Sequence, residues 1–249
     1  MVETHPSQTA DEVSNAATTS PPRDAVIIIP VRNLVLFPGM IVPVTIERQR
    51  SIAAAQRALR DQRQVGILMQ RDLAIEDPIA IDLHRMGTVA NIVRYITTPD
   101  GSHHLVCQGD ERFEVIEYLK GWSFLVARVR QISEANDPPT SGIEARFLHL
   151  RNQALEVLQL LPQVPQELAG AIDATKGPGA LADIVASYVD VKPEEKQDLL
   201  ETTDVSVRME KLSRILAHRI EVLRLSQEIG QQTKASLDER QREVLLRAS

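Results

Sequence analysis

The feature that most constrains the fold is a series of short apolar runs cut by prolines near the start of the chain. The runs are 26–29, 35–37 and one that begins at Met40, and the breaks between them are Pro30 and Pro38-Gly39. Short runs rich in Val and Ile, bounded by Pro and Gly, are typical of buried strands separated by tight turns. Because proline donates no backbone hydrogen bond, Pro30, Pro38 and Pro43 belong at strand starts, edges or bulges. The stretch therefore predicts the start of a strongly bent sheet.

The chain from 25 to 134 continues as a sheet with one helix. Residues 48–62 carry apolar side chains at helical spacing, with arginines on the other faces. Further strands are expected at 65–69, 88–97, 103–108, 112–119 and 122–132, with a variable loop at 73–82. Pro99-Asp100-Gly101 is a strong turn signal, which predicts a hairpin around it. The pattern favours a small curled or barrel-like antiparallel β domain at 25–134.

Beyond a Pro- and Gly-containing linker at 135–143, the period is helical. We expect a small helical bundle over 144–203, with helices near 147–161, 166–174 and 179–189 and another starting at Pro193. Proline in a first turn, followed by Glu194 and Glu195, is typical of a helix start. The fold class is therefore α+β, with a β domain followed by a small α-helical bundle and a long extended helix.

The long helix is expected over 204–249, with Asp204 as its N-cap. Its first half has one apolar face, whereas its second half has only Ile229, Leu237, Val244 and Leu245 among polar residues. Such a helix needs a partner helix or a following domain. Apolar residues recur every seven positions, which indicates a coiled coil, but the second core position of each heptad is mostly polar. Whether this helix forms a coiled coil therefore stays open. The chain ends inside this helix, at an Ala248-Ser249 that resembles a cloning remnant, and this predicts an amino-terminal fragment of a longer protein.

Charge and cysteine content narrow the class of protein. Residues 1–204 carry 19 Lys and Arg against 28 Asp and Glu, whereas 205–249 carry 9 against 6. An acidic body is a poor match for nucleic acid, and a mildly basic helix is typical of a solvated face. The single cysteine, Cys107, excludes an internal disulfide, which fits a reducing compartment. Cys107 lies in an apolar run, so we expect its side chain to be buried. Residues 1–24 are expected to be a disordered tail without a targeting signal, and no stretch is apolar enough to span a membrane. These features predict a cytoplasmic protein.

No catalytic, cofactor-binding or metal-binding residue is expected in this chain. Gly177-Pro178-Gly179 lacks the Lys and Ser/Thr of a phosphate-binding loop. His103 and His104 are adjacent strand residues, so their side chains point to opposite faces and are poorly placed to share a metal ion. Asp110 and Glu111 show no concave apolar setting for acid–base chemistry.

Three blocks resemble the amino-terminal domain of Lon, the ATP-dependent protease. The first is Pro30-Val31-Arg32-Asn33-Leu34-Val35-Leu36-Phe37-Pro38-Gly39-Met40; the others lie at 87–113 and 181–205. Asn33 stands where the family more often has Asp. The resemblance implies a compact β domain and a helical part, with the ATPase and Ser–Lys peptidase modules, and hence ATP and Mg, downstream of this chain. It also implies a hexamer in the intact enzyme, and Arg112 is expected to tie a turn to the barrel.

The predicted binding surface is apolar. Leu36, Phe37 and Met40 surround a Pro-Gly turn where full burial is hard, and Met adapts to varied partners. The alternative is that these side chains close the barrel end. Met69 and Leu73 form a second candidate for the same role.

The favoured function is a non-catalytic substrate-recognition and assembly region of a Lon-like ATP-dependent protease. By resemblance, it binds unfolded or damaged client proteins and passes them toward a hexameric ATPase ring, while the isolated chain self-associates through its long helix as a dimer or higher oligomer. The alternative is a free-standing adaptor or scaffold with no protease attached. A weaker alternative is nucleic-acid binding through the basic helix, which a steep loss of affinity with salt would reveal.

Overall fold

A computed structural model describes residues 20–134 and 140–247, and describes side chains through residue 241. Contacts within the chain divide it into two compact units. The sheet unit contains the chain up to Asn136 together with Ala186–Thr203, and the helical unit contains Asp137–Val185 together with Asp204–Ser249. Residues 1–19 of the expected 1–24 tail, residues 135–139 of the expected 135–143 linker, and Ala248-Ser249 lie outside the described residues.

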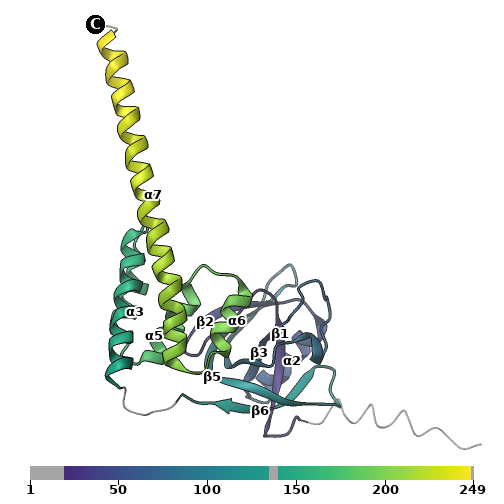
Figure 1. The fold of residues 1–249 in the computed structure, drawn as a ribbon. Helices are drawn as coiled ribbons and strands as arrows, with labels where there is room; N and C mark the ends of the chain where they lie inside the picture. Colours follow the sequence, from purple (N-terminus) through teal and green to yellow (C-terminus); the bar gives the residue numbers. More distant parts are fainter. Residues whose placement is uncertain (1–19, 135–139, 248–249) are drawn as a thin grey trace, which may run out of the picture. The chain divides into compact units, whose positions relative to one another are not determined.

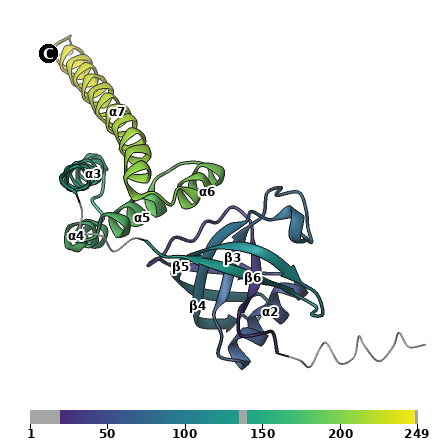
Figure 2. The same cartoon turned by 60° about the horizontal axis from the view of Figure 1, so that its bottom comes forward.

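The sheet unit is built from six strands and two helices (Figures 1 and 2). In chain order they are β1 (Ala25–Val31), β2 (Ile41–Ile46), α2 (Gln49–Arg60), β3 (Val65–Met69), β4 (Met86–Thr97), β5 (His103–Leu119), β6 (Leu125–Ile132) and α6 (Pro193–Glu201). A short 3-10 turn, Ala80–Asp82, precedes β4. The predicted α+β class and its curled sheet are confirmed.

The sheet closes because β5 is long enough to pair with two strands along one edge. Its first part pairs with β2 and its second part pairs with β6, while its other edge pairs with β4. The order β5-β4-β3-β1-β6 therefore returns to β5, which leaves β2 as the one strand outside the ring among residues 20–134. The predicted hairpin at Pro99-Asp100-Gly101 joins β4 to β5, and Gly101 has φ +84°.

One pair differs from the antiparallel expectation, because β1 and β3 run parallel. The segment between them contains β2 and α2, so the chain crosses over before it returns beside β1. The core beneath these strands includes the fully enclosed Ile28, Leu68 and Phe113. Gly87 on β4 has no room for a side chain, since a Cβ there would meet the Ile67 carbonyl oxygen at 2.2 Å.

Strand β2 has one open edge, because it pairs only with β5 among the described strands. The Gly109 amide donates to the Met40 carbonyl oxygen at 2.8 Å, just before β2. The alternation of an antiparallel ladder then directs the backbone of Val42 and Val44 toward β5 and that of Pro43 outward. Pro43 therefore occupies the only kind of position that a proline tolerates in this ladder.

Helix α6 belongs to the sheet unit. The sequence had predicted one helical bundle over 144–203, but the contacts divide this segment between the two units. Arg112 on β5 is 2% exposed, and its Nε donates to the Leu200 carbonyl oxygen at 2.9 Å. Gln197 Nε2 donates to the Met86 carbonyl oxygen at 2.9 Å. Arg112 thus caps the last turn of α6, a longer-range role than the turn contact expected from the sequence.

The helical unit packs α3 (Ser141–Leu160) against the first part of α7 (Val205–Arg247), with α4 (Gln166–Ala174) and the first part of α5 (Pro178–Tyr188) completing it. Asp204 caps α7 as predicted, since its Oδ1 accepts from the Val207 amide at 3.0 Å. Buried apolar side chains fill the interior: Leu150, Ala154, Leu158, Leu181, Val185, Met209, Leu212 and Leu216. Arg208 and Asp183, both buried, approach to 3.5 Å within this interior.

The second half of α7 has little packing within the unit. Gln227 Nε2 still donates to the Leu160 carbonyl oxygen at 3.3 Å, at the end of α3. Every side chain from Arg224 to Gln241 is exposed. This is the under-buried helix expected from the sequence, with Leu225, Ile229 and Leu237 open to solvent. No helix in the described part of the chain is long and apolar enough to cross a membrane.

Candidate functional site

The predicted Pro-Gly turn is well formed, but its Phe side chain is not on the surface. The Met40 amide donates to the Phe37 carbonyl oxygen at 3.2 Å, and Gly39 has φ +77°. The Gly39 amide donates to the Gly109 carbonyl oxygen at 3.0 Å, which ties the turn to β5. Leu36 is 2% exposed and Phe37 is 0% exposed. In this structure neither side chain is open to a client, which fits the alternative that they close the barrel end.

The other three predicted binding residues differ from one another in exposure. Met69, the last residue of β3, is 4% exposed and packs in the core. Met40 is half-buried. Leu73 is 43% exposed and is the most exposed of the five predicted residues.

Leu73 belongs to a loop that carries further exposed aliphatic side chains. This loop, residues 70–83, joins β3 to β4 and is called the apolar loop below. Ile79 is 54% exposed and Ile81 is 78% exposed. Sequence reasoning missed both, because isolated aliphatic residues between Pro and Asp show neither a strand nor a helix period. The signal that could have identified them is the presence of several aliphatic residues in a segment that is neither helix nor strand, because such a loop has no regular face to bury them.

A second group of exposed apolar side chains lies on the outer surface of the sheet. Ile41 on β2 is 58% exposed, and Val93 and Ile96 on β4 are 59% and 39% exposed. Val93 lies at an irregularity in the β4–β5 pairing between Ile92 and Arg94.

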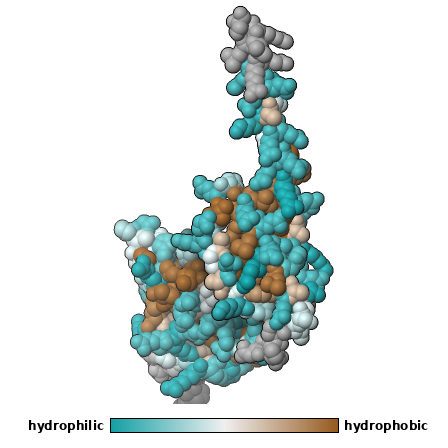
Figure 3. All heavy atoms as spheres, turned by 90° about the vertical axis from the view of Figure 1, so that its left-hand side faces the viewer, coloured by the Kyte–Doolittle hydropathy of each residue, from teal (hydrophilic) through white to brown (hydrophobic). Residues whose placement is uncertain are grey.

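In the helical unit, Figure 3 shows apolar side chains gathered around the packed helices and mostly polar side chains along the rod that emerges from them.

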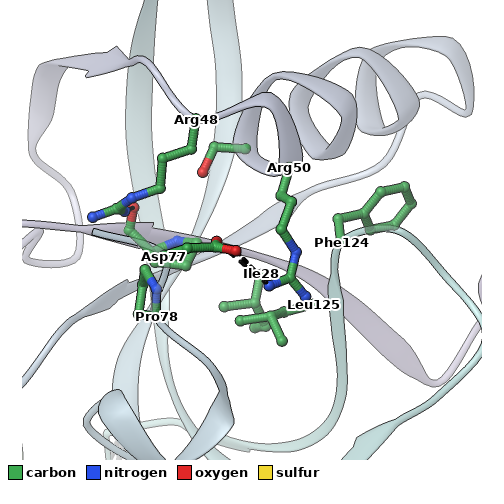
Figure 4. A pocket seen from close by; sticks show the side chains of 9 residues that line it. Ile28, Arg48, Arg50, Asp77, Pro78, Phe124 and Leu125 are labelled. Atoms are coloured by element: carbon green, nitrogen blue, oxygen red, sulfur yellow. Dashed lines mark hydrogen bonds and ion pairs between the residues drawn. The ribbon is translucent and has the colours of Figure 1, made fainter. Parts of the chain in front are cut away.

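The two larger hollows found in the described part of the sheet unit are open and lined by both polar and apolar groups. One, of about 330 Å³, lies between the end of β1, strand β2 and the start of α2, and Arg32 and Arg48 line it. Another, of about 490 Å³, lies near Met86, Glu114 and Arg130. A third pocket holds only about 10 Å³; Figure 4 shows the Arg50–Asp77 ion pair across it, with an Nη1–Oδ2 distance of 3.3 Å. Neither of the two larger hollows has the enclosed apolar character typical of a small-molecule site, and the third is too small for such a ligand.

The residues considered for chemistry have structural partners. The Tyr95 hydroxyl lies 2.6 Å from His103 Nδ1, whereas the Thr45 hydroxyl lies 3.0 Å from His104 Nδ1. Burial raises the pKa of the Cys107 thiol to about 11, so the thiol stays neutral and unreactive at pH 7. Gln64 Nε2 donates to an Asp110 carboxylate oxygen at 2.9 Å. Within the described residues, no group of three or more His, Cys, Asp or Glu side chains is placed to hold a metal ion.

Comparisons with known proteins agree on one family. The family model described as the "ATP-dependent protease La (LON) substrate-binding domain" matches residues 25–218. The chain is 57% identical over 230 residues to the Lon protease of Methylocella silvestris and 52% identical over 238 residues to that of Phenylobacterium zucineum. These matches cover 92% and 95% of this chain but only 28% and 30% of the two relatives.

A solved structure supports the same fold. The N-terminal domain of Lon protease from the Mycobacterium avium complex superposes with a TM-score of 0.66 at 24% identity, covering 78% of this chain and 98% of that domain. The sequence matches identify the relatives, and the superposition shows the shared architecture of sheet and helices. The chain therefore belongs to the family of Lon-protease substrate-binding domains, as its opening motif indicated.

Proposed function

We propose that this chain is the substrate-recognition region of a cytoplasmic ATP-dependent serine protease of the Lon type. In this proposal its sheet unit binds exposed apolar segments of misfolded and regulatory proteins. The proposal is carried by the aliphatic side chains that the sheet unit leaves open, chiefly Leu73, Ile79 and Ile81 on the apolar loop and Ile41 and Val93 on the sheet. Unfolded polypeptides differ from folded ones mainly in the apolar groups they expose, so an apolar surface discriminates between them.

The catalytic steps are assigned to other parts of the protein. The chain spans less than a third of the Lon proteases it matches. We place the AAA+ ATPase module, with its ATP and Mg, and the serine peptidase module in the remaining part. This chain then acts before catalysis, by raising the local concentration of clients near the ATPase ring.

The long helix α7 supplies the connection and the contact between copies. Its exposed Leu225, Ile229 and Leu237 are the apolar side chains available for a partner helix. We propose that the isolated chain dimerises or forms a higher oligomer through these residues as a coiled coil, and that the intact enzyme is a hexamer. Replacing Leu225 and Ile229 with Lys is expected to lower the oligomeric state measured by sedimentation velocity, without unfolding the two units. An unchanged oligomeric state would remove α7 as the contact.

The test of recognition compares unfolded and native forms of one client. Reduced, carboxymethylated α-lactalbumin stays unfolded without denaturant, and native α-lactalbumin has the same sequence apart from the modification. Fluorescence anisotropy is expected to show weak, saturable binding of the unfolded form and none of the native form. Equal binding of both forms, or of neither, would contradict the proposal. A salt titration distinguishes this binding from nucleic-acid binding. Affinity for nucleic acid falls steeply as salt is added, whereas affinity based on apolar contacts does not.

A further inference from the structure

A second kind of candidate site is the open hollow of about 330 Å³ between the end of β1, strand β2 and the start of α2. Its volume lies at the lower end of the roughly 300–1,000 Å³ that is typical of ligand pockets. Leu34, which is half-buried, and Pro43, which is exposed, supply apolar surface to its lining. Because the hollow is open, a group that enters it can remain attached to a longer chain.

Two arginines line this hollow without a carboxylate partner. Arg48 donates to Gln70 Oε1 at 2.6 Å and also to the Glu76 carbonyl oxygen. Arg32 Nη2 lies 3.5 Å from the Ile75 carbonyl oxygen. All of these acceptors are neutral, and neither arginine forms an ion pair with another described residue. Both guanidinium charges are therefore available to an anion in the hollow.

The lining of the hollow has a positive net charge. Its one acidic residue is the exposed Glu47, so two arginines against one glutamate leave one positive charge. Asp77 lies nearby but pairs with Arg50, and Figure 4 shows the Arg48 side chain extending away from that pair. Burial lowers the pKa of Arg48, and Arg32 lowers it further, whereas Asp77 and Glu47 raise it, each less strongly than Arg32 lowers it. An anion in the hollow would offset the repulsion between the two guanidinium groups.

The start of α2 adds hydrogen-bond donors to this setting. The side chain of its N-cap residue, Arg48, makes no capping hydrogen bond, and the first turn contains no acidic residue. The first intrahelical bond runs from the Ile52 amide to the Arg48 carbonyl oxygen at 2.9 Å, so the amides of residues 49–51 precede it. The helix dipole places a partial positive charge at this end, which favours an anion beside it.

The hydroxyl of Ser51 points independently to a ligand. Ser51, the third residue of α2, is 3% exposed and lines the hollow. Its hydroxyl has no hydrogen-bond partner in the described part of the chain. Buried hydroxyl groups are usually paired, and a hydroxyl that lines a hollow can donate to an acceptor that enters it.

The donors and the apolar lining together narrow the chemistry of the ligand. Guanidinium, amide and hydroxyl donors suit the oxygens of a carboxylate or a phosphate. Apolar surface beside them favours a ligand that carries an apolar group next to its charge. The C-terminal residue of a polypeptide has this composition, because its carboxylate and its side chain are attached to the same carbon atom. Inorganic phosphate lacks the apolar part.

We propose that this hollow binds the C-terminal carboxylate of a client whose last residue is apolar. The carboxylate lies against Arg32 and Ser51, and the side chain of the last residue lies against Leu34 and Pro43. Capture of a chain end by backbone amides is a recurring mode of peptide recognition. This inference rests on the proposed function and adds to it a second site of different chemistry. It gives the client a recognition signal that does not depend on how much of its apolar interior is exposed.

The first test compares three fluorescent peptides of one sequence that ends in Leu. One has a free C-terminal carboxylate, one has a C-terminal amide, and one has the amide together with Glu as its next-to-last residue. The free-carboxylate peptide is expected to bind about tenfold tighter than the amide peptide, and the Glu peptide should resemble the amide peptide. Equal binding of all three would overturn the proposal. A Glu peptide as tight as the free-carboxylate peptide would do the same, as would tighter binding of inorganic phosphate.

The second test removes single donors. Arg32→Gln and Ser51→Ala are expected to weaken binding of the free-carboxylate peptide by about fivefold and threefold, and to leave binding of the amide peptide unchanged. Both variants should keep their thermal stability, because Arg32 is exposed and Ser51 has no hydrogen bond to lose. The matched control is Arg60→Gln, which makes the same charge change at the exposed other end of α2 and should keep the tenfold preference. A preference that survives in both test variants, or that the control loses equally, would overturn the proposal.

The third test locates the contact by NMR. The backbone amide resonances of Gln49, Arg50 and Ser51 should move when the free-carboxylate peptide is added, whereas the amide peptide should leave them in place. Unmoved resonances in a sample that binds the free-carboxylate peptide would overturn the assignment to this hollow. If unfolded α-lactalbumin binds but no preference for a free carboxylate is found, this inference fails and the proposed function stands. If the preference is found but unfolded and native α-lactalbumin bind equally, the proposed function fails and the hollow keeps its assignment as a site for chain ends.

Discussion

The buried arginine of β5 gives the sharpest prediction about stability. Arg112→Leu removes the guanidinium that donates from Nε to the Leu200 carbonyl oxygen at 2.9 Å. The Leu200 carbonyl then lacks this donor in the last turn of α6, and the shorter side chain leaves the space of the guanidinium unfilled. Helix α6 should separate from the sheet unit more often, while the strands keep their pairing.

The magnitude follows from the position of the group. A hydrogen bond from a charged donor contributes about 1.5–3 kcal/mol, and an unfilled space of this size adds about 1 kcal/mol. The pairing with Glu134 at 3.6 Å adds little, because Glu134 is 34% exposed. We expect the free energy of unfolding to fall by about 2.5–4 kcal/mol, which lowers Tm by roughly 10 °C for a domain of this size.

The assay combines urea unfolding with amide hydrogen exchange. Amides of Pro193–Glu201 should exchange faster in Arg112→Leu, whereas those of β3 should change less. Arg130→Leu is the matched control, because Arg130 also lies in the sheet unit and pairs with a carboxylate, Glu114, but is 66% exposed; it should cost at most about 1 kcal/mol. The reasoning is refuted if the two variants are equally stable, or if α6 keeps its protection in Arg112→Leu.

Three further predictions concern single positions. Phe37→Ala should lower the free energy of unfolding by about 3–5 kcal/mol in urea titrations, while the folded fraction should bind unfolded α-lactalbumin as the unchanged chain does. A loss of binding without a loss of stability would instead support Phe37 as a binding residue, as the sequence predicted. Gly87→Ala should yield a destabilised chain by thermal melting, because its Cβ would lie 2.2 Å from the Ile67 carbonyl oxygen; a normal Tm would contradict this. Hydrogen bonds from the Thr98 hydroxyl and from Ser102 lower the pKa of Asp100 from 3.8 to about 2. The stabilisation by Asp100 is therefore complete above pH 3.8 and is lost as pH falls toward 2, so an NMR titration should give a midpoint near 2 and Asp100→Asn should lose this acid dependence.

Local signals predicted much of the secondary structure. Pro99-Asp100-Gly101 marked the β4–β5 hairpin, and Asp204 marked the start of α7, because turn and cap chemistry depends on residues close in sequence. The sparse apolar content of α7 predicted its exposure for the same reason. These features need no knowledge of distant contacts.

The candidate site was harder to predict, because burial at a turn depends on distant residues. Phe37 beside Pro-Gly suits either an exposed contact or a side chain that closes the barrel end. Its full burial in this structure, in a turn that is hydrogen-bonded to Gly109, favours the second interpretation. Ile79 and Ile81 show no period, so their exposure follows only from the closed path of the apolar loop. The parallel β1–β3 pair and the capping of α6 by Arg112 likewise join residues far apart in sequence.

The proline on the outer edge of β2 bears on the proposed binding of unfolded chains. Closure of the ring leaves β2 as the one described strand with an open edge, and Pro43 removes a backbone donor from the middle of that edge. Edge strands with a full set of donors recruit other strands and can seed fibrils, above all where sticky polypeptides are concentrated. Under the proposed function, Pro43 therefore makes it harder for a bound client to extend the sheet at this edge.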